Sequence, residues 1–172
     1  MSLQAITVIG HDRPGIIAET TRVLADLGLN LEDSTMTLLR GHFAMMLLCA
    51  GDTPSAEVEA ALAPLTADGT LTVAVREVPE EAGQEAVGAS YVLTVHGGDR
   101  PGIVSRVATE VAGVGGNITD LTTRLAGELY LLVAEVDLPA AADVAALQES
   151  LRAAAADLGV GVTLREVESD DL

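Results

Sequence analysis

The sequence predicts an α+β protein in which two similar βαββαβ domains follow each other. One observation is an internal repeat, because Gly10-His-Asp-Arg-Pro-Gly15 returns 87 positions later as Gly97-Gly-Asp-Arg-Pro-Gly102. A second is the order of the hydrophobic patterns, which is strand, helix, strand, strand, helix, strand in each half. The third is the repeat length, which is too long for a solenoid unit of roughly 20–50 residues. A repeat of this size fits two small domains within the 172 residues.

In the first half, each expected element has a local signal. Pro14 is expected at the first position of a helix, where its fixed φ is favourable, and Gly28 is expected to stop that helix. Arg40-Gly41 separates two apolar runs and predicts a hairpin turn. A second helix is expected to open after Pro54. We expect strands at residues 3–9, 31–39, 43–50 and 71–75.

The second half repeats this order, with helices expected to start near Pro101 and Ala140. Strands are expected at residues 91–95, 117–125, 128–137 and 160–167. The arrangement is that of the ferredoxin-like fold with an antiparallel sheet. Residues 79–89 are acidic, contain glycine and lack periodicity. We therefore expect domains at residues 1–78 and 90–172, with residues 79–89 as the linker.

The segment Phe43–Ala50 is apolar almost throughout, whereas a half-buried strand alternates. Two helices per domain cover only one face of a sheet. We therefore expect another subunit to cover the other face, and a homodimer is the simplest such assembly. The threonine-rich strands around Thr35 and Thr122 are expected at the sheet edges, where they can pair side by side.

Composition excludes several classes of partner. The formal net charge is −17 with nine Lys and Arg residues, which argues against direct binding of nucleic acid or of an anionic membrane surface. The single cysteine, Cys49, excludes an intrachain disulfide framework and indicates a reducing compartment. Neither a signal peptide nor an apolar run of roughly 20 residues is evident. We expect a cytoplasmic protein.

The repeated Asp-Arg-Pro-Gly loop joins a strand to the start of a helix in each half. A helix N-terminus offers unpaired N–H groups and partial positive charge, which suit a carboxylate. Gly15 and Gly102 allow close approach to the backbone, and Asp12 and Asp99 can pair with an ammonium group. These features together describe a small amino-acid site.

A structural interpretation of the same residues stays open. Aspartate before a helix is commonly an N-cap, and proline is common at the first helical position. Asn30 and Asn117 begin the second strand of each half and can orient a ligand through their amides, yet asparagine is also a frequent turn residue. A duplicated turn and a duplicated site produce the same repeat.

The pattern Asp-Arg-Pro-Gly-Ile, followed about fifteen residues later by Gly-x-Asn, resembles the ACT domain. Two such domains filling nearly the whole chain resemble the glycine cleavage system transcriptional repressor group. The resemblance implies amino-acid binding at the interface between ACT domains. By position, the resemblance implies that the ligand-binding residues are Asp12, Arg13, Gly15, Ile16 and Asn30 in the first copy and Asp99, Arg100, Gly102, Ile103 and Asn117 in the second.

The copies differ around the loop, since Gly98 replaces His11, and Thr119 and Leu121 replace Glu32 and Ser34. We therefore expect the first copy to bind if only one does.

Other chemistries lack support in the sequence. Ile16 and Ile17 stand where a phosphate-binding loop needs Lys and Ser or Thr. His11, His42 and His96 lack metal-ligand spacing, so a metal site would require the fold to gather them. No catalytic nucleophile or carboxylate pair is apparent, and we expect neither an enzyme, a cofactor nor a metal.

The preferred hypothesis is a non-enzymatic regulatory protein that binds a small amino acid of the glycine or serine class. Binding would shift an interaction with a protein partner, as in transcriptional control of amino-acid metabolism. The alternative is an interaction module that assembles through its apolar sheet face without any ligand.

Overall fold

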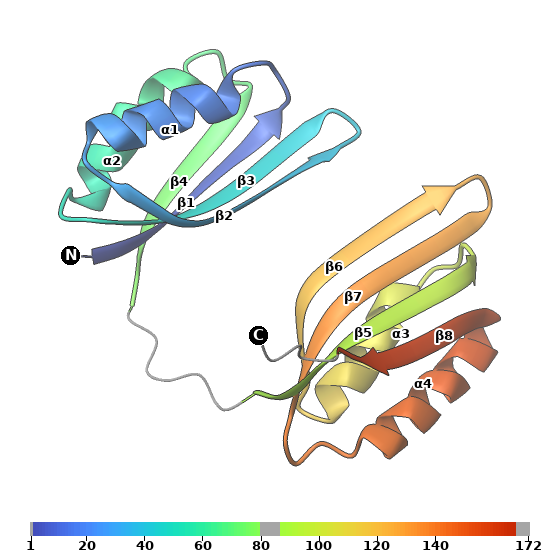
Figure 1. Ribbon diagram of the computed structural model, residues 1–172. Coiled ribbons are helices and arrows are strands. Elements are labelled where there is room, and N and C mark those ends of the chain that lie inside the picture. Colours follow the sequence, from blue (N-terminus) through green and yellow to red (C-terminus); the bar gives the residue numbers. More distant parts are fainter. Residues whose placement is uncertain (1, 80–86, 168–172) are drawn as a thin grey trace. The chain divides into compact units, whose positions relative to one another are not determined.

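The computed structural model describes residues 2–79 and 87–167 of the chain, which divides into two compact units at residues 1–82 and 83–172. Each unit is a four-stranded antiparallel sheet with two α-helices on one face (Figure 1). The strand orders are β2-β3-β1-β4 and β6-β7-β5-β8. The expected pair of ferredoxin-like βαββαβ domains with antiparallel sheets is confirmed.

The elements of the first domain follow the expected order, with a short 3₁₀ helix, η1, added after the second helix. They are β1 (Ser2–His11), α1 (Ile16–Asp26), β2 (Asn30–Leu39), β3 (His42–Gly51), α2 (Ser55–Leu62), η1 (Ala63–Thr66) and β4 (Leu71–Val78).

The second domain contains β5 (Val87–Gly98), α3 (Ile103–Gly113), β6 (Asn117–Ala126), β7 (Leu129–Pro139), α4 (Val144–Leu158) and β8 (Val160–Glu166). Strand β5 starts inside the segment predicted as linker, so residues 87–89 are strand. Residues 80–86 of that segment lie outside the described residues. No helix in the described ranges is long and apolar enough to cross a membrane.

Two helix starts differ from the predictions. Pro14 lies before α1 and not at its first position, because Gly15 is the N-cap with φ 93° and ψ −7°. These angles are those of the third residue of a type II turn, which favours proline before it and glycine at that position. In the second domain α4 begins at Val144, and the carboxylate of Asp143 accepts a hydrogen bond from the Ala146 N–H at 2.9 Å. The side-chain cap therefore sets a start four residues after the expected Ala140.

The predicted stop of α1 at Gly28 is confirmed. Gly28 has φ 71° and its N–H donates to the carbonyl of Ala25, while the Leu29 N–H donates to the carbonyl of Leu24. This pair of bonds is the Schellman motif, which needs a left-handed residue that glycine supplies. The chain is thereby turned directly into β2.

The hairpin predicted at Arg40-Gly41 is also confirmed. Leu39 pairs with His42 across a two-residue loop in which Arg40 has φ 50° and Gly41 has φ 84°. Two positive φ values are characteristic of a type I′ turn, whose twist matches that of the flanking strands. The hairpin tip lies beside the end of β1 (Figure 1).

The face that the helices leave open carries apolar side chains in both sheets. In the first domain these include Ile9, Ala44, Met46 and Leu48, while the β3 side chains that point toward the helices are buried. In the second domain Leu129, Leu131 and Val133 of β7 are exposed on this face, beside the charged side chains Arg124, Glu135 and Arg165. The apolar character of β3 on both sides is thus confirmed, and β7 has a similar apolar stretch on its open face.

Candidate functional site

The loop Gly10–Gly15 and its repeat Gly97–Gly102, here called the first and second loops, have the same backbone shape. Gly15 and Gly102 both have φ 93°, with ψ values of −7° and −2°. Neither α1 nor α3 has a side-chain cap. The interpretation of Asp12 and Asp99 as N-caps is therefore wrong, and both side chains are exposed.

Each loop leaves the first turn of its helix open to an incoming anion. The first helical hydrogen bonds run from the Glu19 N–H to the Gly15 carbonyl and from the Arg106 N–H to the Gly102 carbonyl, both at 2.9 Å. The N–H groups that precede these donors have no partner within an α-helix. Together with the partial positive charge of the helix terminus, they can hold a carboxylate.

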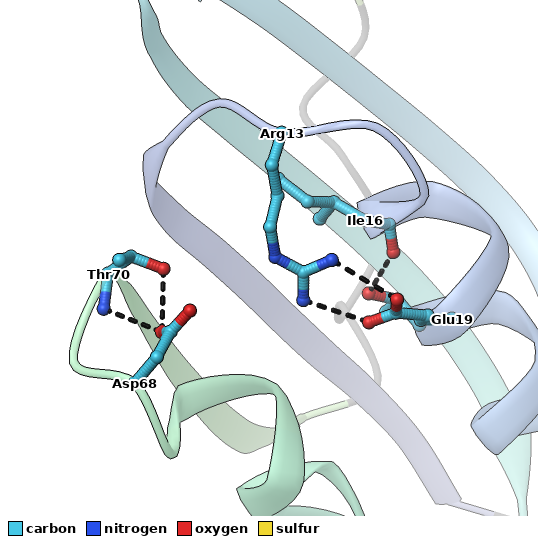
Figure 2. Close-up of polar contacts among 6 residues, drawn as sticks. Arg13, Ile16, Glu19, Asp68 and Thr70 are labelled. Carbon is cyan, nitrogen blue, oxygen red and sulfur yellow. Dashed lines mark hydrogen bonds and ion pairs between the residues drawn. The ribbon is translucent and has the colours of Figure 1, made fainter.

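In the first loop, an arginine side chain is held by an acid of the adjoining helix. Figure 2 shows the Arg13 guanidinium reaching along α1 to Glu19, with Nη1 3.1 Å from Oε1 and Nη2 2.9 Å from Oε2. This bidentate pair raises the pKa of Arg13 and lowers the pKa of Glu19, chiefly through the side-chain hydrogen bonds. The only cationic group of the loop is thereby neutralised by the helix that follows it.

A second carboxylate lies on the other side of Arg13. Asp68, in the turn before β4, accepts hydrogen bonds from the Thr70 hydroxyl at 2.7 Å and the Thr70 N–H at 2.9 Å (Figure 2). These bonds lower the pKa of Asp68, and the positive charge of Arg13 adds to the effect. The surroundings of the first loop therefore carry more negative than positive charge.

In the second loop the acid is replaced by a base. Arg106 occupies the position after Gly102 that Glu19 occupies after Gly15, and it pairs with Glu110 one turn along α3 at 3.2 Å. Arg100 is exposed, and among the described residues it makes no hydrogen bond or ion pair. It lies beside Gly159 at the C-terminus of α4. The second loop therefore lacks the Arg–Glu pair of the first, and its arginine lies at the C-terminus of α4.

Access to the two glycine N-caps differs in the same way. A Cβ placed on Gly15 would lie 3.5 Å from Oε1 of Glu19, so the carboxylate lies close over this N-cap. A Cβ on Gly102 would have no neighbouring atom within 4 Å. The Glu19 carboxylate therefore lies beside the first N-cap, whereas the space beside the second N-cap is open.

The predicted asparagines lie far from the loop of their own domain. Strands β1 and β2 both run antiparallel to β3 and hence parallel to each other. Asn30 is in register with Ala50 and, through it, with Leu3, at the opposite end of the sheet from His11. Eight residues of strand separate Leu3 from His11, which is roughly 25 Å. Asn117 is placed likewise at the start of β6. One domain alone does not bring its loop and its asparagine to the same small ligand.

The residues that distinguish the two loops, Glu19 and Arg106, were not among the predicted site residues. Their signal was present in the sequence, because they occupy corresponding positions of the repeat with opposite charge. The remaining predicted positions, Ile16 and Ile103, are buried at the start of α1 and α3 and anchor the loops to the cores. Their side chains therefore support the loop and leave only backbone atoms for a ligand.

Cysteine and histidine occupy separate parts of the first domain. Cys49 is buried on β3, and burial raises the pKa of its thiol, with a smaller contribution from Glu32. His11 and His42 face each other at the far end of the same sheet, with ring centroids 6.5 Å apart. No cluster of three or more His, Cys, Asp or Glu side chains suited to a metal occurs within residues 2–79 and 87–167.

These features define a tandem pair of small α+β modules, each with a glycine-capped helix start after its first strand. The ACT domain family model matches residues 4–76 and again residues 90–165. The chain therefore belongs to the ACT domain family, with two copies of the domain.

Two similar sequences and one similar solved structure extend the comparison. The glycine cleavage system transcriptional repressor of Escherichia coli K12 is 26% identical over 160 residues, covering 89% of this chain and 84% of that protein. A UPF0237 protein of Methanopyrus kandleri is 50% identical over 48 residues, which are 28% of this chain and about half, 53%, of that protein. The crystal structure of an unknown protein from Galdieria sulphuraria superposes with a TM-score of 0.83 at 26% identity and covers 96% of this chain and 98% of that one.

Proposed function

We propose that this protein is a non-enzymatic regulator that binds a small amino acid of the glycine or serine class between ACT domains. The open second loop carries the proposal. Its helix N-terminus can receive the carboxylate, Arg100 adds positive charge, and Asp99 can pair with the ammonium group. Membership of the ACT family and likeness to a transcriptional repressor support the regulatory role.

A site that uses both loop and asparagine requires two domains. Strand β2 is an edge strand and ends at the same end of the sheet as the first loop. If an edge strand of another domain lies antiparallel beside it, the start of that strand, with Asn30 or Asn117, comes to the loop end of the sheet. The asparagine is then roughly 14 Å from the end of β1, across β2 and β3, in place of the roughly 25 Å separation within one domain.

The edge strands have the exposure that such an interface needs. All ten residues of β2 are exposed, including Leu31, Met36 and Leu38 on the helix side. A hollow of about 170 Å³ between α1 and β2 is lined by apolar and hydroxyl side chains. An exposed hydrophobic edge is a ready template for another strand. We propose that a second copy of the chain supplies it, giving a homodimer.

Amino-acid binding would regulate a protein partner and not nucleic acid directly. With a formal net charge of −17, the chain cannot neutralise phosphates well. A ligand that favours one arrangement of the ACT domains shifts that equilibrium by its differential affinity. We place this regulation in the cytoplasm, in transcriptional control of amino-acid metabolism.

The test is a thermal-shift screen of the full chain against the twenty amino acids, with glycine and serine first. Ligand at 100 times its dissociation constant stabilises the folded state by about 2.7 kcal/mol. Asn30→Ala and Asn117→Ala should reduce the shift, and Arg100→Gln should weaken it through the second loop. Arg13→Gln is the matched control, because Glu19 already neutralises Arg13.

A melting temperature that no amino acid raises at millimolar concentration would refute the ligand proposal. A stable dimer found together with that result would favour the alternative, an interaction module that assembles through its apolar sheet face without any ligand. A ligand-induced shift that both asparagine variants retain in full would refute the placement of the site.

A further inference from the structure

The ends of β1 and β3 bring two histidines together that lie 31 positions apart in the sequence. His11, the last residue of β1, is the direct ladder partner of His42, the first residue of β3. Their ring centroids are 6.5 Å apart and their planes make an angle of 87°. Both side chains are exposed, so each ring can turn without displacing the core.

We propose that His11 and His42 bind one divalent transition-metal ion of the class that prefers imidazole, namely Zn²⁺, Ni²⁺ or Cu²⁺. An ion that holds one nitrogen of each ring at 2.0–2.1 Å in tetrahedral geometry sets the two ring centroids about 5 Å apart. The observed separation of 6.5 Å is slightly larger. Side-chain rotation of two exposed rings on adjacent strands closes that difference.

The surroundings leave the imidazole nitrogens available. Among the described residues, neither ring takes part in a hydrogen bond or an ion pair. Asp12 follows His11 directly and is exposed, and the strongly negative chain attracts cations. Arg13 is turned to Glu19, which leaves Arg40 of the hairpin as the cation nearest in sequence to His42. We therefore expect Arg40→Gln to strengthen metal binding.

The described residues offer the ion two protein ligands, because no third His, Cys, Asp or Glu joins the pair there. The remaining coordination positions are open to water or to a small chelating molecule. Such a site is weaker than a structural four-ligand zinc site, and it keeps the metal exchangeable.

The second domain supplies a built-in control. His96 is an exposed histidine of β5 that pairs with Leu131 and Gly161, so no imidazole faces it. Its ring lies over Gly161, where a Cβ would come within 2.5 Å of Cε1. The chain contains only three histidines, and two of them form the pair.

The experiment is a Zn²⁺ titration of the chelator-treated full chain, followed by imidazole ¹⁵N NMR and by calorimetry. We expect saturation at one ion per chain, with the His11 and His42 signals shifting together while the His96 signal stays in place. His11→Gln and His42→Gln should each weaken binding at least tenfold, and His96→Gln should leave it unchanged.

Equal shifts of all three imidazoles, or full Zn²⁺ affinity in either His11→Gln or His42→Gln, would overturn the proposal. The NMR readout needs no variant, so it tests the pair even if a substitution impairs folding. The result is also independent of the amino-acid screen, because the titration contains the metal alone.

Discussion

The first and second loops have the same backbone and opposite charge at one position. Glycine and proline fix the turn in both, which gives Gly15 and Gly102 the same φ of 93°. Four residues after its glycine, α1 has Glu19, which forms an ion pair with Arg13 of the loop. At the same position α3 has Arg106, which forms an ion pair with Glu110 one turn further along the helix. Turn geometry and ligand access are therefore set by different residues, and a repeat can keep the first while changing the second.

The largest expected effect comes from Gly10→Ala. A Cβ on Gly10 would lie inside contact distance of the Thr70 carbonyl oxygen and 2.9 Å from the Leu71 Cα, both backbone atoms of the paired strand. We expect a loss of about 3 kcal/mol of unfolding free energy in the first domain. A Cβ on Gly97 would lie 2.8 Å from Cγ1 and 3.0 Å from Cα of Val160, and Gly97→Ala should cost about 1–2 kcal/mol in the second domain.

Denaturant unfolding separates the two domains by their chromophores. Both tyrosines, Tyr91 and Tyr130, lie in the second domain, and the chain has no tryptophan. Tyrosine fluorescence therefore follows the second domain, while far-ultraviolet circular dichroism follows both. Equal losses for Gly10→Ala and Gly97→Ala would contradict the expectation that the Thr70 carbonyl oxygen makes the first substitution more costly.

Gly15→Ala and Gly102→Ala should have equal effects, because the two turns share one backbone conformation. Each places a side chain at φ 93°, which costs about 1–2 kcal/mol. The same unfolding measurement checks this expectation. A clear difference between the two variants would break the equivalence of the loops.

Glu19→Gln should make the first loop resemble the second. Removing the negative charge near the Gly15 N-cap frees Arg13, so a carboxylate ligand should bind the first loop roughly tenfold more tightly. Calorimetric titration with the amino acid that raises the melting temperature in the thermal-shift screen measures the change in affinity and stoichiometry. Arg106→Gln is the matched control, and it should not improve binding at the second loop.

The smallest expected effect is the pH dependence of the Arg13–Glu19 pair. Since the folded-state pKa of Glu19 is lowered from 4.5, the pair stabilises the first domain above that pH. Its contribution is lost as the pH falls through the folded-state pKa. The small stability advantage over Glu19→Gln should be present near neutral pH and vanish in acid, which paired denaturation curves would reveal. A constant difference at all pH values would contradict this assignment.

Much of the fold followed from local patterns, since Gly28 and Arg40-Gly41 each have turn chemistry that sequence alone specifies. The helix starts were less accurate, because Pro14 suits both a turn and a first helical position, and only the φ of Gly15 decides between them. Predicting the candidate site also requires the directions of the strands. A strand-helix-strand connection is parallel, so a loop and the asparagine after its helix lie at opposite ends of one sheet.

Two exposed edge strands in one chain, β2 and β6, raise a question of closure. If the two strands of one chain pair with strands of two different copies, every added chain leaves a fresh β2 or β6 and the assembly grows into a filament. If both strands pair with strands of the same partner, the β2 and β6 strands of two chains are all paired and growth stops.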